Sequence, residues 1–362
     1  MSNQARKILA ALSAMGVVAS ALSACSSSGG PSGGVVTNAK ATATVSAGPA
    51  NSALDAVCQK GGQEGEVDYW TEQDPSVFGK EASLFEKAYP KIKVKVTQLQ
   101  PQDQVTRALT EIQAHHKLTA DVLAPDPVVG LPLFQGKHVQ SIDLSQYGVS
   151  KDLATDVAGT TVYTTQRVYQ GIAFNTQQYK AADLPDTWKG LVDSKFAGKI
   201  SVDPRAKWLA PIVTAPGWGM DATVSWYKDL LKVDKPQIVN GATNSLTKVS
   251  SGEVPLTTSA RNAEVNEQRT KGAPLDIKYL DIVPVHSVVA SQLVADPHPN
   301  AATCFLAWLA GPVGQAQQFK YEFKSSAKPD GIPANSVIAD DTSATGVKLI
   351  SEAQDKMAAL TK

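Results

Sequence analysis

Three short segments between residues 66 and 124 set the fold: Glu66-Val67-Asp68-Tyr69-Trp70, Ile92-Lys93-Val94-Lys95-Val96 and Ala120-Asp121-Val122-Leu123-Ala124. Each has the length and composition of a β-strand, and the second alternates strictly between apolar and charged side chains. Between them, apolar residues recur at helical spacing over residues 78–89 and 105–112. The order strand, helix, strand, helix, strand predicts a mostly parallel sheet with helices on both faces.

A second series of strand-like and helix-like segments follows, and the chain then becomes mainly helical. We expect strands at residues 169–176, 198–204, 255–258 and 275–283, and helices at 184–192, 208–215, 222–231, 246–249 and 263–271. Further helices are expected at residues 300–310, 312–323 and 347–360. With 362 residues, 43% of them hydrophobic and 19% charged, the chain is long enough for about two α/β domains.

The overall charge argues against binding to nucleic acid. Lys and Arg together number 34, as do Asp and Glu, so the formal net charge is zero. An excess of positive charge attracts the phosphate backbone of nucleic acids, and the chain as a whole has no such excess. Bulk attraction to anionic lipid is not expected for the same reason.

Motifs of common enzyme classes are missing from the sequence. It contains no Gly-x-Ser-x-Gly, His-Glu-x-x-His, Walker A or Gly-x-Gly-x-x-Gly motif. Ser325-Ser326-Ala327-Lys328 has the Ser-x-x-Lys spacing of penicillin-recognising enzymes, but no Ser-Asp-Asn or Lys-Thr-Gly motif follows it. We therefore expect a protein that is not an enzyme and that needs no cofactor.

The N-terminus predicts export from the cytoplasm. Arg6 and Lys7 precede an apolar stretch over residues 8–22, which is too short to span a bilayer comfortably as a mature helix. It ends in Leu22-Ser23-Ala24-Cys25, which resembles the bacterial lipobox, in which the cysteine becomes lipidated. Ordinary secretion with a chance cysteine is the alternative. We expect a signal peptide over residues 1–24 and a lipidated Cys25, carrying palmitate, that anchors the protein to the outer face of the cytoplasmic membrane.

A flexible tether is expected to follow the anchor. Residues 26–52 are mostly Ser, Gly, Ala, Thr, Val and Pro without helical or strand periodicity, and we assign residues 25–60 to this segment. With Cys25 lipidated, Cys58 and Cys304 remain. An oxidising compartment allows one disulfide between them, and two separate buried thiols are the alternative.

Several segments together resemble a known family. They are Gly171-Ile172-Ala173-Phe174-Asn175-Thr176, then Leu184-Pro185-Asp186-Thr187-Trp188, then Phe196-Ala197-Gly198-Lys199-Ile200, and finally residues 298–315, which begin His298-Pro299-Asn300-Ala301-Ala302. In this order they resemble segments of the bacterial extracellular solute-binding proteins of ABC importers, in the branch that includes ferric-, thiamine-, phosphonate- and polyamine-type binders.

This resemblance implies a two-lobed periplasmic-binding-protein type II fold, with two mixed, mostly parallel sheets joined by two hinge crossovers. The crossovers would fall near Ile172–Asn175 and Ile282–Pro284. Lobe 1 would comprise residues 65–172 plus 284–362, and lobe 2 residues 173–283. The protein would be a monomer that closes around a small solute and docks on a membrane permease with its ATPase. A surface lipoprotein outside transport, such as the partner of a sensor or an adhesin, remains an alternative with the same fold.

The loops that face the cleft between the lobes are the expected solute site, since ligands of parallel sheets bind beyond the carboxyl ends of the strands. The candidate residues are Thr71, Glu72, Asp74, Asp126, Asn175, Arg205, Ser259, Arg261 and Asn262. Arg205 and Arg261 would each lie near a helix start and bind a carboxylate or phosphonate, although both could be ordinary surface arginines. Trp70, Trp208 and Trp218 are possible stacking walls, with core packing as the alternative.

Ferric iron is the alternative cargo within the same family. Relatives that hold ferric iron directly have a Tyr-Tyr pair at the segment matched here by Ala260-Arg261-Asn262-Ala263-Glu264, and this chain lacks that pair. His115 and His116 are adjacent on an expected helix and point in different directions, which disfavours shared ligation. We therefore expect no metal ligands and an organic solute with an anionic group.

Overall fold

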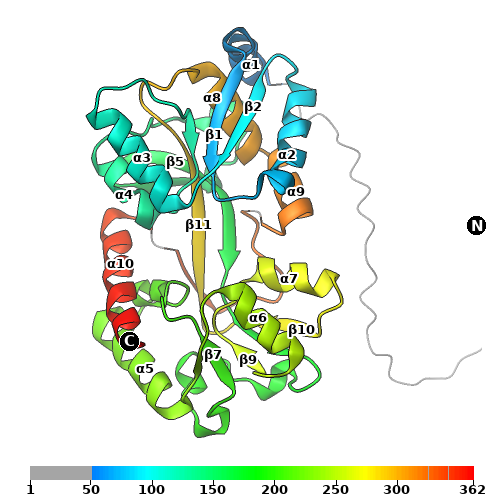
Figure 1. Ribbon diagram of the computed structural model, residues 1–362, viewed down its shortest axis with the longest axis vertical. Helices are drawn as coiled ribbons and strands as arrows, with labels where there is room; N and C mark the ends of the chain where they lie inside the picture. Colours follow the sequence, from blue (N-terminus) through cyan, green and yellow to red (C-terminus); the bar gives the residue numbers. More distant parts are fainter. Residues whose placement is uncertain (1–50, 325, 341) are drawn as a thin grey trace, which may run out of the picture. The chain divides into compact units, whose positions relative to one another are not determined.

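The computed structural model of the chain describes residues 51–324, 326–340 and 342–362. Within these residues the protein is an α/β structure with two β-sheets, one in each of two lobes, and β11 runs lengthwise between them (Figure 1). The expected fold class is confirmed. The expected signal peptide and Cys25 lie outside the described residues, as does Ser325 of the Ser-x-x-Lys motif.

The sheet of lobe 1 has the order β2-β1-β3-β11-β5-β4, and β12 pairs with β11. Its strands are β1 (Glu66–Thr71), β2 (Lys93–Gln98), β3 (Val122–Leu123), β4 (Ala154–Val157), β5 (Thr160–Tyr169), β11 (Ile282–Gln292) and β12 (Val337–Ala339). The first three are parallel to one another, as the sequence predicts, whereas β11 runs antiparallel to β3 and β5.

Helices pack on this sheet through apolar stripes. They are α1 (Ser52–Glu64), α2 (Pro75–Ala88), α3 (Pro101–Gln113), α4 (Pro127–Gln135), α8 (Pro299–Ala310) and α9 (Pro312–Glu322), with 3-10 turns η1 (Leu144–Tyr147) and η2 (Lys151–Leu153). Tyr69 of β1, Phe78 of α2 and Phe305 of α8 meet in the core with ring centroids 5.0–6.3 Å apart. Such aromatic contacts add to the hydrophobic stabilisation that burial of the same side chains provides.

The sheet of lobe 2 has the order β10-β6-β9-β7-β8. Its strands are β6 (Ile172–Asn175), β7 (Ile200–Val202), β8 (Gln237–Ile238), β9 (Leu256–Thr257) and β10 (Leu275–Lys278). Around them lie α5 (Gly219–Asp234), α6 (Ala242–Ser251), α7 (Asn262–Thr270) and the 3-10 turns η3 (Ala181–Asp183), η4 (Lys189–Leu191), η5 (Ser194–Phe196) and η6 (Ala210–Thr214). In both sheets parallel and antiparallel pairings are equally frequent, so the expected excess of parallel pairs is not found.

Two chain segments connect the lobes. β5 ends at Tyr169 and β6 begins at Ile172, while β10 ends at Lys278 and β11 begins at Ile282. At the first connection the backbone of Gln170 forms an antiparallel bridge with Arg261. These short links lie directly before the expected crossovers near Ile172–Asn175 and Ile282–Pro284, which coincide with β6 and the start of β11.

The segment 184–192 contains no α-helix, contrary to expectation. Trp188 is fully buried there, and its backbone N–H donates to the Asp281 carboxylate at 3.0 Å. Its indole N–H donates to the Ile282 carbonyl oxygen at 2.7 Å. These tertiary hydrogen bonds replace the helical ones, so only short 3-10 turns form. Residues 208–215 likewise form a 3-10 turn instead of an α-helix.

The expected flexible tether over residues 25–60 is wrong in its last part, because residues 52–60 belong to a helix. The helix α1 begins at Ser52, capped by the Asn51 side chain, and packs against α8. Cys58 of α1 and Cys304 of α8 are joined in a disulfide with their Cα atoms 5.0 Å apart. The apolar residues Leu54 and Val57 reach the lobe 1 core, which explains why this segment folds.

The C-terminal helix α10 (Ala344–Ala359) also corrects the expected boundaries, which place all of residues 284–362 in lobe 1. It packs against α4 of lobe 1 and against α5 and η6 of lobe 2 (Figure 1). Met357 is fully buried in the lobe 2 core, and the hydroxyl of Thr361 donates to the Pro204 carbonyl oxygen at 2.9 Å. The helix therefore connects the two lobes at a third place.

Candidate functional site

A cavity of about 270 Å³ lies where loops of the two lobes meet at β5 and β11. Lobe 1 contributes the ends of its parallel strands, through Glu72 after β1 and Asp126 after β3. Gln166 of β5 and His286 of β11 also line it. The position agrees with the rule that ligands of α/β sheets bind beyond the carboxyl ends of the strands.

Lobe 2 contributes a tight loop after β7. Arg205, Lys207 and Trp208 all line the cavity, and Ala206 between them has a positive φ of 52°. This left-handed residue reverses the chain locally, so that the side chains on both sides of it can reach the cavity. No α-helix starts here, so the expectation that Arg205 lies near a helix start is wrong.

Asp203 holds the Arg205 side chain in place. The guanidinium donates from Nε and Nη2 to the two carboxylate oxygens, at 2.9 and 2.6 Å. Burial of Asp203 favours its neutral form, but the hydrogen bonds from Arg205 prevail and lower the pKa of Asp203. The Arg205 side chain is 53% exposed, so it remains accessible to a solute while its direction is fixed.

Arg261 occupies the inner wall of the cavity. It is the N-cap residue of α7, as the sequence predicts for a position near a helix start, and it forms an ion pair with Glu264. Its Cζ lies 3.8 Å from the centroid of the Trp208 ring. Burial lowers the pKa of Arg261 to about 10, so the group stays charged at neutral pH. Its Nε is buried and has no hydrogen-bond partner among the described residues, so one donor in this wall is unsatisfied.

His286 closes the cavity from β11. Its ring meets the Trp208 ring edge to face, with centroids 4.8 Å apart. Burial lowers the pKa of His286 well below its usual value, and the nearby cations Lys207 and Arg261 act in the same direction. The imidazole is therefore neutral and can donate or accept a hydrogen bond from a solute.

One ion pair joins the two sides of the cavity. Lys207 Nζ lies 3.2 Å from Asp126 Oδ2, although the two residues are 81 positions apart in the sequence. Asp126 also caps α4, because its Oδ1 accepts from the Val129 N–H at 3.0 Å. The pair therefore connects a lobe 2 loop to the start of a lobe 1 helix.

Positive charge predominates in the cavity wall. Its cationic side chains are Arg205, Lys207, Arg261 and Lys324, whereas its carboxylates among the described residues are Glu72 and Asp126. A neutral imidazole and the face of one tryptophan add polar and flat surfaces to this wall. Such a set can hold a small anion and stack a planar group beside it.

The structure brings four of the candidate residues together at this cavity: Glu72, Asp126, Arg205 and Arg261. The other five do not line it. Thr71 is buried at the end of β1 and hydrogen-bonds Gln73, while Asp74 caps α2 at a neighbouring pocket. Ser259 is buried, and the Asn175 amide donates to the Val249 carbonyl oxygen at 2.8 Å.

Asn262 has a structural role near a different cavity. Its Oδ1 accepts from the Tyr169 N–H at 2.8 Å, which ties α7 to the end of β5. It lines a groove of about 980 Å³. This groove shares no lining residue with the cavity around Arg261. Of the three tryptophans considered as stacking walls, only Trp208 lines the Arg261 cavity, because Trp70 and Trp218 are buried in the lobe cores.

Several cavity residues escape the sequence analysis. Lys207 follows Arg205 by two positions and could be found from the same loop. His286 and Ser287 interrupt the apolar residues of β11, and this interruption is a usable signal. Lys324 follows α9, and Gln354 lies on α10; no pattern in the sequence points to either of them.

A profile of the family described as bacterial extracellular solute-binding protein matches residues 69–316, about two thirds of the chain. The chain belongs to this family. No curated protein sequence matches this solute-binding protein. Its type II fold is the one the sequence resemblance implies.

Solved structures share the fold of this solute-binding protein at low sequence identity. Iron-bound HitA from Pseudomonas aeruginosa is 16% identical with a TM-score of 0.65, covering 82% of this chain and 99% of its own. The Trichodesmium protein IdiA (FutA) in complex with iron and citrate is 14% identical with a TM-score of 0.67, at the same coverages. A substrate-binding protein of an ABC transporter from Agrobacterium tumefaciens is 14% identical with a TM-score of 0.61, covering 81% and 95%.

The described part of this solute-binding protein offers no membrane-spanning segment. None of its helices is both long enough and apolar enough to cross a bilayer.

Proposed function

We propose that this protein is the lipid-anchored solute-binding component of an ABC importer. It captures a small organic solute with an anionic group in the cavity around Arg261 and delivers it to a membrane permease and its ATPase. Family membership supports solute binding, and the excess of cations over carboxylates in the cavity wall supports an anionic group. The choice of an anionic solute rests on this excess of cationic side chains in the cavity wall.

Capture depends on two lobes that close on the solute. We assign residues 65–172 with 284–340 to lobe 1 and residues 173–283 to lobe 2, with α10 in contact with both. A solute that contacts Arg205 and Arg261 of lobe 2 together with Asp126 or Gln166 of lobe 1 prefers the closed arrangement and shifts the population toward it. The ion pair of Lys207 with Asp126 supports the same arrangement.

Ferric iron is the second candidate cargo. The solved structures named above include proteins with bound iron, which favours this possibility. Hard ferric iron prefers phenolate and carboxylate oxygen atoms. No tyrosine occurs among the described residues that line the cavity, and its four cations, although each is ion-paired, outnumber its two carboxylates. An organic anion therefore fits the cavity better.

The anchor is tested by one substitution. In Cys25→Ala the lipid attachment site is absent, and the protein is expected to leave the membrane fraction for the medium or the soluble extracytoplasmic fraction. A processed product that stays on the membrane in this variant would contradict lipidation of Cys25. The solute is tested by thermal unfolding of the ligand-free protein with phosphonates, thiamine, polyamines, sugars and ferric ion, because any solute that binds the native state raises its melting temperature.

A further inference from the structure

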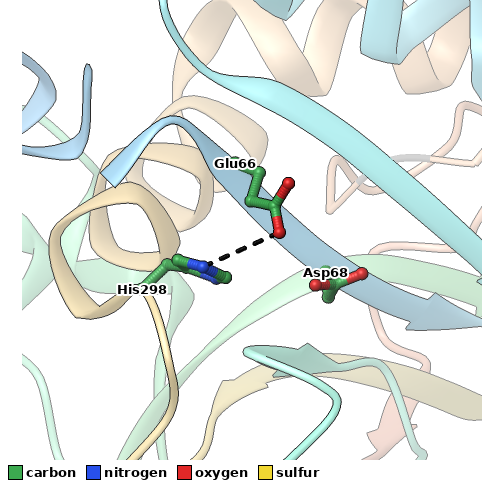
Figure 2. A group of neighbouring side chains, drawn as sticks. All are labelled: Glu66, Asp68 and His298. Atoms are coloured by element: carbon green, nitrogen blue, oxygen red, sulfur yellow. Dashed lines mark ion pairs between the residues drawn. The ribbon is translucent and has the colours of Figure 1, made fainter. Parts of the chain in front are cut away.

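Three side chains of types that can ligate a metal ion lie together at the end of lobe 1 away from the cavity. Glu66 and Asp68 of β1 and His298 before α8 each place one ligand atom within 4.8 Å of the other two (Figure 2). Glu66 begins β1 and Glu72 follows its end, so at about 3.3 Å per residue the two sites are ~20 Å apart. This group is thus separate from the solute cavity.

Asp121 fixes the orientation of the His298 ring. Its carboxylate is fully buried, and it accepts from the backbone N–H groups of Asp68 at 2.7 Å and His298 at 2.9 Å. His298 Nδ1 lies 2.9 Å from Asp121 Oδ2. An accepting carboxylate requires the hydrogen on Nδ1, so the neutral ring has its lone pair on Nε2. A buried carboxylate behind a histidine is the arrangement that orients imidazole ligands of metal ions.

The free nitrogen points to the carboxylates of β1. His298 Nε2 lies 3.8 Å from Glu66 Oε1, and Asp68 completes the group (Figure 2). Ligands of a tetrahedral ion with bonds of about 2.0–2.2 Å are about 3.3–3.6 Å apart, so small side-chain movements suffice. All three side chains are only partly buried, so an ion can enter from solvent and water can fill its remaining positions.

We propose that Glu66, Asp68 and His298 form a binding site for a divalent first-row transition metal such as Zn²⁺. One imidazole nitrogen with two carboxylates suits these ions, and two negative charges balance the charge of the ion. The bound ion links the start of β1 to the start of α8.

Lys95 competes with the ion. Its Nζ lies 2.6 Å from Glu66 Oε1, the same oxygen that faces His298. The Lys95 side chain is 54% exposed, so it can turn into solvent when an ion takes its place. Removing this amine is therefore expected to strengthen metal binding. Damage to the fold would weaken binding instead, so a gain in affinity distinguishes the two effects.

The test is titration of the chelator-treated full-length protein with Zn²⁺ by calorimetry, and with Co²⁺ by absorption spectroscopy. One equivalent of Zn²⁺ is expected to bind and to raise the melting temperature by roughly several degrees at a hundredfold excess over Kd. His298→Gln keeps a donor for Asp121 and should lose at least tenfold in affinity, as should Glu66→Gln. Lys95→Met should gain severalfold, and the control His116→Gln, an exposed histidine elsewhere, should match the wild type.

Two results would overturn the proposal. One is an absence of Zn²⁺ binding by the wild-type protein at micromolar to millimolar concentrations. The other is binding that His298→Gln and Glu66→Gln leave unchanged, as would occur if the ion occupied another place, including the solute cavity. Circular dichroism of each variant verifies that a loss of binding does not reflect unfolding.

Discussion

The guanidinium of Arg261 lies over the ring of Trp208, with Cζ 3.8 Å from the ring centroid, although the two residues are 53 positions apart in the chain. Trp208 in turn contacts His286, so the tryptophan links a lobe 2 helix start to the long strand β11. The ring limits the positions that Arg261 can adopt and shields one of its faces from water. A cation held in this way loses little freedom when it binds an anion.

Substitution of either residue in this pair is expected to weaken solute binding. Arg261→Ala removes charge-assisted hydrogen bonds worth about 1.5–3 kcal/mol, which corresponds to a loss of roughly 10- to 150-fold in affinity. Trp208→Leu should cost less, because the charge remains but its support is gone. Calorimetric titration with the identified solute measures both, and Arg269→Ala, on the outer part of α7, is the matched control. Equal affinity in Arg261→Ala and Arg269→Ala would contradict this role.

Arg205→Ala should weaken binding while changing stability little. The Arg205 side chain is 53% exposed and contributes little burial. The Asp203 carboxylate keeps the backbone donors of residue 205, at 2.9 Å, and of Gly241, at 3.1 Å. We expect a loss of about 1 kcal/mol or less in unfolding free energy, together with at least a tenfold loss of affinity. Urea unfolding and calorimetry on the same preparation separate the two effects; a large stability loss with normal affinity would reverse the assignment.

Glu81 predicts a dependence of stability on pH. It is fully buried in α2, and burial together with the Glu322 carboxylate raises its pKa from 4.5 to about 9. Between these two pH values the folded chain retains a proton that the unfolded chain releases. Stability from this group is therefore full below about pH 4.5 and falls as the pH rises toward 9, by up to about 1.4 kcal/mol per unit.

Glu81→Gln should remove this part of the pH dependence and raise the melting temperature at pH 8. Urea unfolding at several pH values from 5 to 9 measures the slope for both proteins. Glu86→Gln, a change on the same helix at a less buried carboxylate, serves as the control. Identical slopes for the wild type and Glu81→Gln would show that Glu81 is ionised in the folded protein.

The disulfide between Cys58 and Cys304 should stabilise the protein without affecting the solute site. It closes a loop of 246 residues and joins α1 to α8, neither of which contributes a residue to the lining of the cavity. Replacing both cysteines with alanine should lower the unfolding free energy by about 2–5 kcal/mol. Urea unfolding with and without a reducing agent measures this, with unchanged solute affinity below the transition. A double variant as stable as the oxidised wild type would disprove the stabilising role.

The sequence predicts the first three strands of lobe 1 and their order, because their apolar patterns are strong and the helices between them are amphipathic. Their carboxyl ends then place Glu72 and Asp126 at the cavity by topology alone. The segment around Trp188 is different, since its helix-like pattern gives way to hydrogen bonds with residues more than 90 positions away. A local sequence pattern contains no information about partners this far away in the chain.

The central strand β11 escapes prediction for a related reason. It is buried on both faces, and it carries polar side chains such as Ser287 and Gln292 that only tertiary partners satisfy. The sequence pattern predicts a strand only as far as residue 283, so it covers just the first residues of β11 and misses His286, which lines the cavity. The pairing of Lys207 with Asp126 likewise depends on how the two lobes meet, which neither loop encodes alone.

The most direct test of the account is calorimetric titration of ligand-free protein, wild type and Arg261→Ala, with organic anions and with ferric ion. We predict that at least one small organic anion binds the wild type with a stoichiometry of one and that Arg261→Ala binds it at least tenfold more weakly. Tight binding of ferric ion with no binding of any organic anion would contradict it.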